Sequence, residues 1–350
     1  MKILGIESSC DETAASVVED GRILHSNVIV SQIDIHAAYG GVVPEIAARS
    51  HIEAINPVIN QALKEAHCHW NDIDAIAFTY APGLVGSLLI GSLAARTLAV
   101  LHDKPLYPIH HVEAHVYANF LNDTQPEFPL LALIVSGGHS QLVLFHKHGD
   151  YELLGQTQDD AIGEAFDKVA KILGYPYPGG PSIAAAAKHG NPDAYRLPKS
   201  KIAGEYDFSF SGLKTAVLRA VQREVRVDIT FPSNQLAARL SDVQRHDFAA
   251  SFQKIAAETL VDKAEKAFRA YQPTSVVIAG GVAANQELRR QLSARLPLPI
   301  EYAPMALCTD NAAMIATLAY YISREKPASD PYELEIIPSL SMAHTAWAAR

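Results

Sequence analysis

Residues 2–29 read KILGIESSCDETAASVVEDGRILHSNVI, and the architecture of the chain can be worked out from this segment outward. It holds three short apolar runs, 2–7, 14–19 and 23–29, and Asp20-Gly21 joins the last two. Short apolar runs bounded by turn residues are typical of β-strands, and an Asp-Gly pair favours a tight hairpin. We therefore predict three consecutive strands that pair through hairpins.

The segments that follow alternate between helix and strand. A glycine-marked loop over 36–45 places Pro44 in the first turn of a helix, where proline is well tolerated. The predicted elements after this loop are a helix over 44–65, a strand over 73–79, a core helix within 83–101, a strand over 106–109 and a helix that carries His111 and His115. Three hairpin strands followed by this alternation is the order of the ribonuclease-H-like βββαβα unit.

The same pattern restarts near residue 130. Strands are predicted over 130–135, 141–145 and 151–158, and a helix begins near residue 159 with Asp160 as the expected N-cap. The later elements are an irregular segment over 174–215, a helix over 242–271, strands over 275–279 and 300–302, and a last helix from about 308 that carries Asp310 and could pack back onto the first unit.

We therefore predict an α/β protein of two tandem ribonuclease-H-like domains with a cleft between them. The first domain is expected to cover residues 1–125 plus about 305–335. The second is expected to cover 126–304, with an irregular insertion at about 174–240.

Bulk composition limits the function. The net charge of -9 and the pI near 5.9 exclude a broadly basic nucleic-acid-binding protein, although not a local basic patch. Three widely spaced cysteines suit a reducing compartment. Glu7 lies too close to the N-terminus for a signal-peptide core, and Arg96 interrupts the longest apolar run. We expect a cytoplasmic protein that does not cross a membrane.

His111 and His115 are the strongest metal-ligand candidates. They are four residues apart, so on a helix both imidazoles point from one face and could bind one divalent cation. The alternative is a helix that merely carries histidines. A third ligand from elsewhere in the chain would decide between the two.

Three turns carry weaker signals. The turn that contains Asp11 and Glu12 could hold an ion or act as a base, or it could be an ordinary polar hairpin. The turns Ser136-Gly137-Gly138 and Gly280-Gly281 would let backbone N–H groups approach an anion, or they could need glycine only for their dihedral angles.

Basic and aromatic residues gather in the predicted irregular segment and just after it. They are Lys199, Lys201 and Lys214, with Arg196, Arg219, Arg223 and Arg226. Bases can stack on aromatic rings while cations meet phosphates, so this is the candidate nucleic-acid surface. A solvated charged face is the alternative.

Nine ordered motifs resemble one family within the acetate/sugar kinase, Hsp70 and actin superfamily. They are IESSCDET at 6–13, GGVVPE at 40–45, HHVEAH at 110–115, VSGGH at 135–139, GEAFDK at 163–168, YPGGP at 177–181, FSFSGLKT at 208–215, GGVAAN at 280–285 and CTDN at 308–311. Together they strongly resemble the tRNA N6-adenosine threonylcarbamoyltransferase family, called TsaD in bacteria.

The resemblance implies a reaction and a set of site residues. N6 of the adenosine 3′ of the anticodon (adenosine 37), in tRNAs that read codons beginning with A, would attack the carbamoyl carbon of threonylcarbamoyl-AMP, and AMP would leave. By resemblance, His111, His115 and Asp310 bind one divalent metal, Fe(2+) or else Zn(2+). The implied substrate-binding residues are Ile134, Val135, Ser136, Gly137, Gly138, Asp167, Gly180 and Asn285, and the implied catalytic acids are Asp11 and Glu12.

The resemblance also implies binding partners, and it has to be weighed against two alternative functions. The expected partners are tRNA, the paralogue TsaB as a heterodimer, and the P-loop ATPase TsaE. The alternatives are a metallopeptidase and a small-molecule kinase of the same superfamily. A zincin helix needs glutamate directly after its first histidine, and this chain has Val112 there, which argues against a peptidase.

Overall fold

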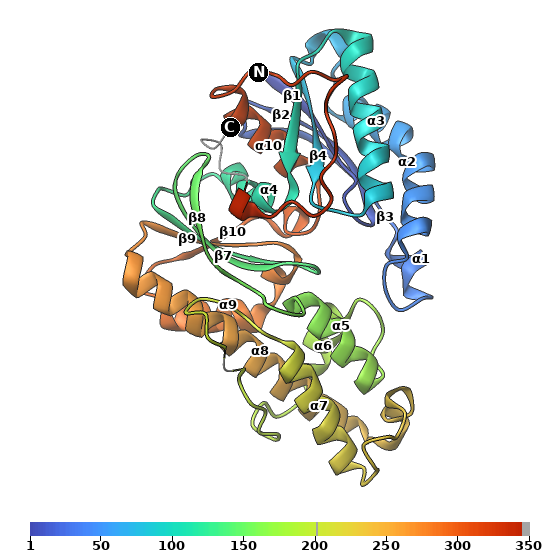
Figure 1. Cartoon of the computed structure of the whole chain (residues 1–350), viewed down its shortest axis with the longest axis vertical. Helices are drawn as coiled ribbons and strands as arrows, with labels where there is room; N and C mark the ends of the chain where they lie inside the picture. Colours follow the sequence, from blue (N-terminus) through green and yellow to red (C-terminus); the bar gives the residue numbers. More distant parts are fainter. Residues whose placement is uncertain (201, 345–350) are drawn as a thin grey trace. The chain divides into compact units, whose positions relative to one another are not determined.

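The computed structural model describes residues 1–200 and 202–344 (Figure 1). The chain separates into two compact units. The first unit contains residues 1–127, 145–152 and the segment from Tyr302 onward, and the second contains 128–144 and 153–301. The domain boundaries predicted from the sequence stay a prediction.

The first unit is built on a five-stranded sheet of order β3-β2-β1-β4-β5. Its strands are β1 Lys2–Glu7, β2 Glu12–Glu19, β3 Ile23–Ser31, β4 Ala75–Ala81 and β5 Leu106–His110. β1 pairs antiparallel with β2 and parallel with β4. Asp20 and Gly21 both take positive φ angles, 53° and 66°, as the predicted tight hairpin requires. The sequence-based order of elements is therefore confirmed.

Helices cover both faces of this sheet (Figure 1). They are α1 Ile33–Ala37, α2 Pro44–Glu65, α3 Val85–His102, α4 His111–Tyr117 and α10 Ala312–Ser323. α2 and α3 pack on one face, and α10 and α4 pack on the other. At Gly5 a Cβ atom would lie 2.3 Å from the Ala312 carbonyl oxygen, so glycine lets α10 pack directly on β1. The last helix thus returns to the first unit.

The second unit repeats the strand order, β10-β9-β6-β7-β8. Its strands are β6 Leu130–Val135, β7 Ser140–Lys147, β8 Asp150–Gln156, β9 Ser275–Ala279 and β10 Ile300–Tyr302. β6 takes the central place that β1 has in the first sheet, and β9 runs parallel to it. The same connection order in both sheets confirms the predicted α/β class with a repeated ribonuclease-H-like unit.

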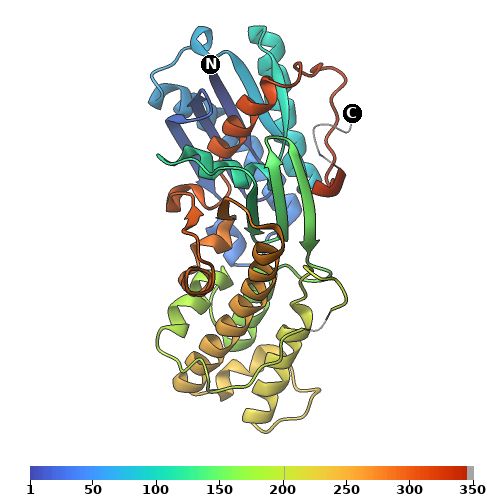
Figure 2. The ribbon, with the colours of Figure 1, turned by 90° about the vertical axis from the view of Figure 1, so that its left-hand side faces the viewer.

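The helices of the second unit are α5 Ile162–Leu173, α6 Gly179–Ala187, α7 Ser211–Glu224, α8 Asp242–Tyr271 and α9 Gln286–Arg295. The long helix α8, visible along its length in Figure 2, contacts the other four helices. Phe208, Phe210, Phe248 and Phe252 are fully buried in the core that these helices share. Burial of such large aromatic side chains contributes several kcal/mol in total, at about 1.5–3 kcal/mol each.

The described residues also form short 3₁₀ helices. These are η1 Trp70–Asp72, η2 Ala118–Leu121, η3 Ser233–Gln235, η4 Ala237–Arg239, η5 Gly281–Ala284, η6 Met305–Leu307 and η7 Met342–His344. Among the helices of residues 1–200 and 202–344, none combines the length and the hydropathy that a membrane crossing needs.

Three local predictions were wrong. α6 lies inside the segment that was predicted to be irregular, because Ile183 and Ala186 bury their side chains in the core. Ala161, not Asp160, is the N-cap of α5, and the Asp160 carboxylate instead accepts a hydrogen bond from Lys168 at 2.6 Å. Asp310 lies two residues before α10 and not on the helix.

Candidate metal centre and substrate site

The first two metal-ligand candidates lie on α4, directly after β5. His110 caps this helix, because its Nδ1 accepts a hydrogen bond from the Glu113 backbone N–H at 3.4 Å. His111 and His115 are buried, and their ring centroids are 4.7 Å apart with the planes at 76°. The two imidazoles therefore converge, as their spacing predicts.

Asp310 comes from the turn before α10. Asn311 fixes this turn, because its Oδ1 accepts a hydrogen bond from Met314 N at 3.0 Å and its Nδ2 donates to Thr309 O at 2.8 Å. Asp310 Oδ1 lies 3.3 Å from His115 Nε2 and 3.7 Å from His111 Nε2. One ligand atom from each of the three residues lies within 4.8 Å of the others. The predicted triad is therefore assembled within the first unit.

The environment of His115 indicates whether these three residues can bind a metal. Its side chain is 1% exposed, and neither ring nitrogen makes a hydrogen bond. Buried polar atoms without a partner are costly, and a bound cation would satisfy one of these two nitrogens. Two imidazoles and one carboxylate form the donor set of many zinc and non-haem iron sites, with positions left open for substrate. The triad fits a divalent metal, and it does not distinguish iron from zinc.

Glu7, which the sequence analysis did not single out, orients His111. It is fully buried at the end of β1, and its Oε2 lies 3.0 Å from His111 Nδ1. Thr79 Oγ1 and Ser9 N donate the hydrogen bonds that hold this carboxylate. When Nδ1–H donates to Glu7, the Nε2 lone pair points to the Asp310 side. A carboxylate behind a ligating histidine is a common feature of metal sites.

Two carboxylates set the charge state of His111. Burial alone would lower the pKa of His111, but the charges of Glu7 and Asp310 and the hydrogen bond with Glu7 raise this pKa to about 9. Burial alone would raise the pKa of Glu7, but the charge of His111 and its hydrogen bond lower it. Glu7 is therefore ionised at neutral pH, as an acceptor for the imidazole N–H must be.

The acidic turn at Asp11 and Glu12 is rigidly held in the same unit. The Cys10 carbonyl accepts hydrogen bonds from His51 Nε2 at 3.0 Å and Ser87 Oγ at 3.1 Å. His51 Nδ1 lies 2.8 Å from Thr13 Oγ1, so α2, which carries His51, holds the acidic turn in place. His51 and Ser87 are supporting residues that spacing could not reveal, because they contact the turn from 40 to 80 residues away.

This turn gathers carboxyl groups that cannot all be ionised at neutral pH. Burial, followed by the charges of Asp310 and Asp11, raises the pKa of Glu12 to about 10. Burial, followed by the charge of Asp11, also raises the pKa of the Cys10 thiol. A cation at the neighbouring triad would offset this repulsion, which is a second reason why the site suits a metal.

The implied substrate residues belong to the second unit. Ile134 and Val135 end β6, and the following turn is tied to the start of α5 by Gly163 N–H to Ser136 O and Glu164 N–H to Gly137 O. A Cβ atom at Gly137, Gly138 or Gly180 would meet nothing within 4 Å, so these backbones are open to a ligand. At Gly280 it would lie 2.5 Å from Val135 O, so the two glycine turns are neighbours.

Asp167, Gly180 and Asn285 lie around these turns. Asp167 Oδ1 accepts a hydrogen bond from Gly179 N at 2.6 Å, which links α5 to the start of α6 beside Gly180. Asn285 caps α9 by accepting from Leu288 N at 3.1 Å. The structure thus joins Val135–Gly138 to the Gly280 turn, and Asp167 to Gly180.

The three predicted tRNA lysines are not equally available. Lys199 Nζ pairs with Asp262 at 2.7 Å and with Glu258 at 3.0 Å, and Lys214 Nζ lies 3.7 Å from Asp160 Oδ2. Lys201 lies outside the described residues. Their role with tRNA stays a prediction.

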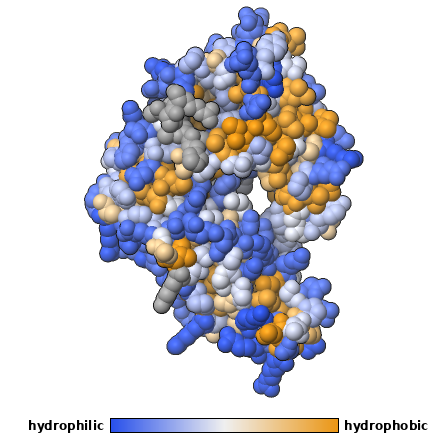
Figure 3. Space-filling model, in the orientation of Figure 1, coloured by the Kyte–Doolittle hydropathy of each residue, from blue (hydrophilic) through white to orange (hydrophobic). Residues whose placement is uncertain are grey.

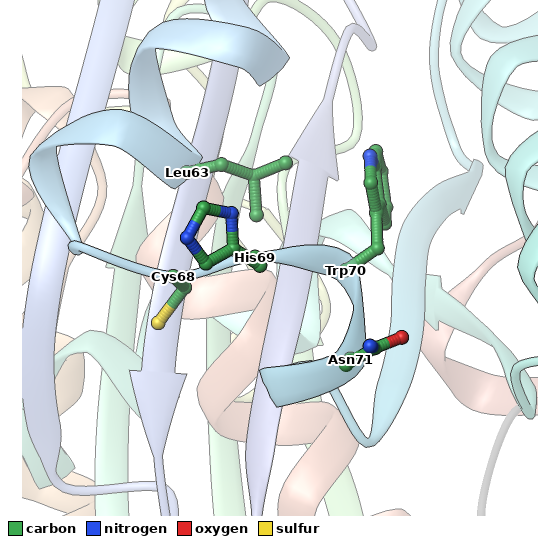
Figure 4. A pocket seen from close by; sticks show the side chains of 5 residues that line it. All are labelled: Leu63, Cys68, His69, Trp70 and Asn71. Atoms are coloured by element: carbon green, nitrogen blue, oxygen red, sulfur yellow. The ribbon is translucent and has the colours of Figure 1, made fainter.

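A surface hollow of about 450 Å³ lies elsewhere on the first unit (Figure 4). In Figure 4 Leu63 and Trp70 face each other across it, and the Cys68 thiol points away. Cys68 Sγ lies 3.8 Å from Lys2 Nζ, at the start of β1, whereas Glu7 is at the end of the same strand. The hollow therefore lies near the start of β1, at the opposite end of this strand from the metal ligands.

The sequence is similar to one protein family over most of its length. The family model of TsaD, tRNA N6-adenosine threonylcarbamoyltransferase, matches residues 23–317. The protein of that name from Thermomicrobium roseum is 51% identical over 94% of both chains. The one from Symbiobacterium thermophilum is 51% identical over 97% of this chain and 96% of its own.

Solved structures share the fold at low identity. Full-length HypF in a phosphate- and nucleotide-bound form matches with a TM-score of 0.59 and 13% identity, over 94% of this chain and 47% of its own. Component A of the Acidaminococcus fermentans (R)-2-hydroxyglutaryl-CoA dehydratase matches with a TM-score of 0.51 and 17% identity, over 93% and 99%. These likenesses show the fold alone.

Proposed function

Because the chain belongs to the tRNA N6-adenosine threonylcarbamoyltransferase family, it transfers a threonylcarbamoyl group to N6 of an adenosine in tRNA, and we propose that threonylcarbamoyl-AMP is the donor. The acceptor is the adenosine 3′ of the anticodon, in tRNAs that read codons beginning with A, and the enzyme acts in the cytoplasm. The observation that carries this proposal is the convergence of His111, His115 and Asp310, together with a buried His115 ring whose two nitrogens make no hydrogen bond.

These three residues would hold one divalent metal, Fe(2+) or Zn(2+). When bound, it supplies Lewis-acid stabilisation of the negative charge that develops on the acyl and phosphate oxygens. Glu7 keeps His111 in the tautomer that presents Nε2. Asn311 keeps the turn of Asp310 in place. The protein's part is therefore to arrange these ligands before the substrate arrives.

The adenylate is bound by residues of the second unit. At Gly137, Gly138 and Gly180 a Cβ atom would meet open space, so the adenylate can approach the backbone N–H groups there. Ile134, Val135 and Ser136 are buried and support the glycine turn that follows them, with Asp167 and Asn285 as polar contacts to the adenylate. Such backbone contacts orient the leaving AMP without specific side-chain chemistry.

The acidic turn accepts the proton that the attacking amine loses. As N6 attacks the carbamoyl carbon and the bond to the phosphate oxygen breaks, the amine must lose a proton. Asp11 accepts it, with Glu12 beside it as the second acid. The hydrogen bonds that His51 and Ser87 donate to the Cys10 carbonyl keep this turn in place.

The proposed function is tested by mass analysis of tRNA nucleosides after incubation with threonylcarbamoyl-AMP, with and without the partner proteins. We expect N6-threonylcarbamoyladenosine at the adenosine 3′ of the anticodon, and AMP in equal amount. Phosphate transfer to a metabolite, or cleavage of protein without tRNA modification, would instead favour the kinase or the peptidase alternative. The similar proteins give neither alternative any support.

Replacing Glu7 with glutamine is expected to weaken metal binding by about 10- to 100-fold, the usual cost of losing a partner behind a ligating histidine. The amide keeps the size of the side chain and can accept from Thr79, but it cannot offer His111 the same charged acceptor. Competition with a chelator measures the affinity. Thr79→Val, which removes only one bond to Glu7, should have a smaller effect, and equal metal affinity in E7Q and wild type would contradict the role.

This chain presents an apolar surface to which the expected heterodimer partner can bind. Large exposed apolar side chains are concentrated on α2 and α3, over which Figure 3 shows a hydrophobic patch. They are Ile52, Val85, Leu89, Leu93, Val100 and Leu101. Patches of this kind mark protein interfaces. We assign this surface to the paralogue TsaB, with TsaE joining the assembled pair.

Leu93→Glu is expected to weaken association with the paralogue by at least about tenfold, since Leu93 is 64% exposed and its burial on binding would stabilise the pair by about 1.5–3 kcal/mol. Analytical ultracentrifugation of the mixed proteins measures this. Val243→Glu is the matched control, because Val243 is 67% exposed on α8 of the second unit. Equal affinities for L93E and wild type would remove the assignment.

A further inference from the structure

Four exposed arginines lie in the second half of α7 and in the segment after it. This arginine surface consists of Arg219, Arg223, Arg226 and Arg239, with Phe231 beneath the Arg239 guanidinium. In Figures 1 and 2, α7 lies at the end of the second unit that is remote from its sheet. None of these residues contributes to the proposed metal or adenylate sites.

The segment is folded firmly against α7. Val227 N donates to Gln222 O at 3.0 Å and Arg226, with a φ of 56°, reverses the chain after the helix. The Gln222 side chain is 2% exposed, and its Nε2 donates to Ile229 O at 3.1 Å. A buried glutamine that bonds to a surface loop fixes the position of that loop. The arginines therefore project from an ordered support.

Part of the positive charge of this surface has no carboxylate partner. Arg219 donates to two neutral oxygens, Gln222 Oε1 at 2.9 Å and Ile229 O at 3.2 Å, and its charge also interacts with that of Asp228. Arg223 and Arg226 form no ion pair with any residue that the structure describes. Between Ser211 and Leu240 the sequence has five basic residues and two acidic ones, in a chain whose net charge is -9.

The two acidic neighbours have other hydrogen-bonding partners. Glu224 Oε1 accepts a hydrogen bond from Gln244 Nε2 at 2.6 Å, and Asp228 Oδ1 accepts from the Thr230 backbone and hydroxyl. Lys199 and Lys214, by contrast, already face carboxylates. A cation without a carboxylate partner gives up less when it binds phosphate.

Arg239 and Phe231 add a flat surface to this charge. The guanidinium carbon of Arg239 lies 4.6 Å from the centre of the Phe231 ring. Stacked guanidinium and aromatic planes can receive an unpaired base or a ribose, and arginine binds phosphate with two parallel hydrogen bonds. This combination suits RNA better than it suits an acidic protein, which has no bases to stack.

We infer that the arginine surface binds the sugar-phosphate backbone of the substrate tRNA, away from the adenosine that is modified. This inference rests on the proposed function only in taking tRNA as the substrate. We expect these arginines, and not Lys199 and Lys214, to make the main electrostatic contact with tRNA. The charges of the two lysines are already paired within the protein.

The test compares two double variants in the full chain, assembled with its partners. Arg223→Ala with Arg226→Ala removes two unpaired cations, and Lys199→Ala with Lys214→Ala removes two paired ones. Affinity for unmodified tRNA is measured by fluorescence anisotropy over a range of salt concentrations. Steady-state KM and kcat for tRNA, and metal content, are measured on the same samples.

We expect the arginine variant to bind tRNA about tenfold more weakly and the slope of log affinity against log salt to fall by about 1 to 2. KM should rise while kcat at saturating tRNA and metal content stay unchanged. The double variant Arg223→Lys with Arg226→Lys should restore most of the salt slope. If the alanine variant lost tRNA binding only because it unfolds, this recovery would not be expected.

Unchanged affinity and slope in the arginine variant would overturn the inference, as would a loss confined to the lysine variant. Loss of partner assembly with unchanged tRNA binding would overturn it in favour of a protein contact. If the proposed function were wrong, wild type would bind tRNA without modifying it. The comparison of tRNA affinities between the variants would still be valid.

Discussion

Asp310→Ala is expected to lose the bound metal and to lower threonylcarbamoyl transfer by at least about a hundredfold. Two imidazoles from a single short helix would remain, and two ligands do not complete a site that needs three protein ligands. Even loss of an outer partner of a ligand typically costs about 10- to 100-fold, so loss of a direct ligand should cost at least the upper end of that range. Metal content per chain, measured by plasma mass spectrometry beside the rate, checks both parts.

The structure also predicts what Asp310→Ala will not do. Asp310 is only partly buried, and its charge disfavours ionisation of Glu12 but favours the protonated form of His111, so its removal has opposing effects on the stability of the metal-free protein. We expect the unfolding temperature of the metal-free form to fall by no more than about 3 °C. Glu325→Ala, an exposed acid just beyond the other end of α10, is the matched control and should keep both metal and rate. Full metal content in D310A would refute the triad.

Regular elements could be predicted because local and tertiary signals agree there. α8 and β9 match their predicted bounds to the residue. Ser241 begins α8 with a capping box to Gln244, and this signal is readable in the sequence. α6 was missed because Gly179-Gly180-Pro181 has the composition of a turn, while its helical form depends on packing against α8.

The candidate site was predictable only in part. Helical spacing predicts that His111 and His115 converge, but nothing in the spacing indicates a carboxylate about 200 residues later. Asp310 was expected on a helix that returns to the first unit, but its assignment as a metal ligand came only from the resemblance. Glu7 was missed because a single glutamate at the end of a strand looks like the start of a turn. Its role appears only when β1, β4 and α4 bring Ser9, Thr79 and His111 around it.

Asp11→Asn is expected to lower the rate of transfer at saturating substrates by about 10²- to 10⁴-fold, the range for loss of a positioned general base. Asparagine keeps the size of the side chain but cannot accept the proton that N6 loses. The turn should keep its shape, since its support comes from hydrogen bonds to the Cys10 carbonyl and from Gln32 N to the Asp11 carbonyl, none of which uses the carboxylate. Single-turnover transfer with prebound tRNA isolates the chemical step.

Metal content, tRNA affinity and one companion variant decide what a slow Asp11→Asn enzyme means. If Asp11 only positioned the metal ligands, metal content would fall together with the rate, and added metal would restore both. If Asp11 is the base, metal content and tRNA affinity stay at the wild-type level while the single-turnover rate alone falls. A larger loss in Glu12→Gln than in D11N would transfer the role to Glu12, whose charge interacts with the same two carboxylates. Wild-type rates in D11N would leave the proton to another acceptor, and the acidic turn would then serve only to balance the charge of the metal.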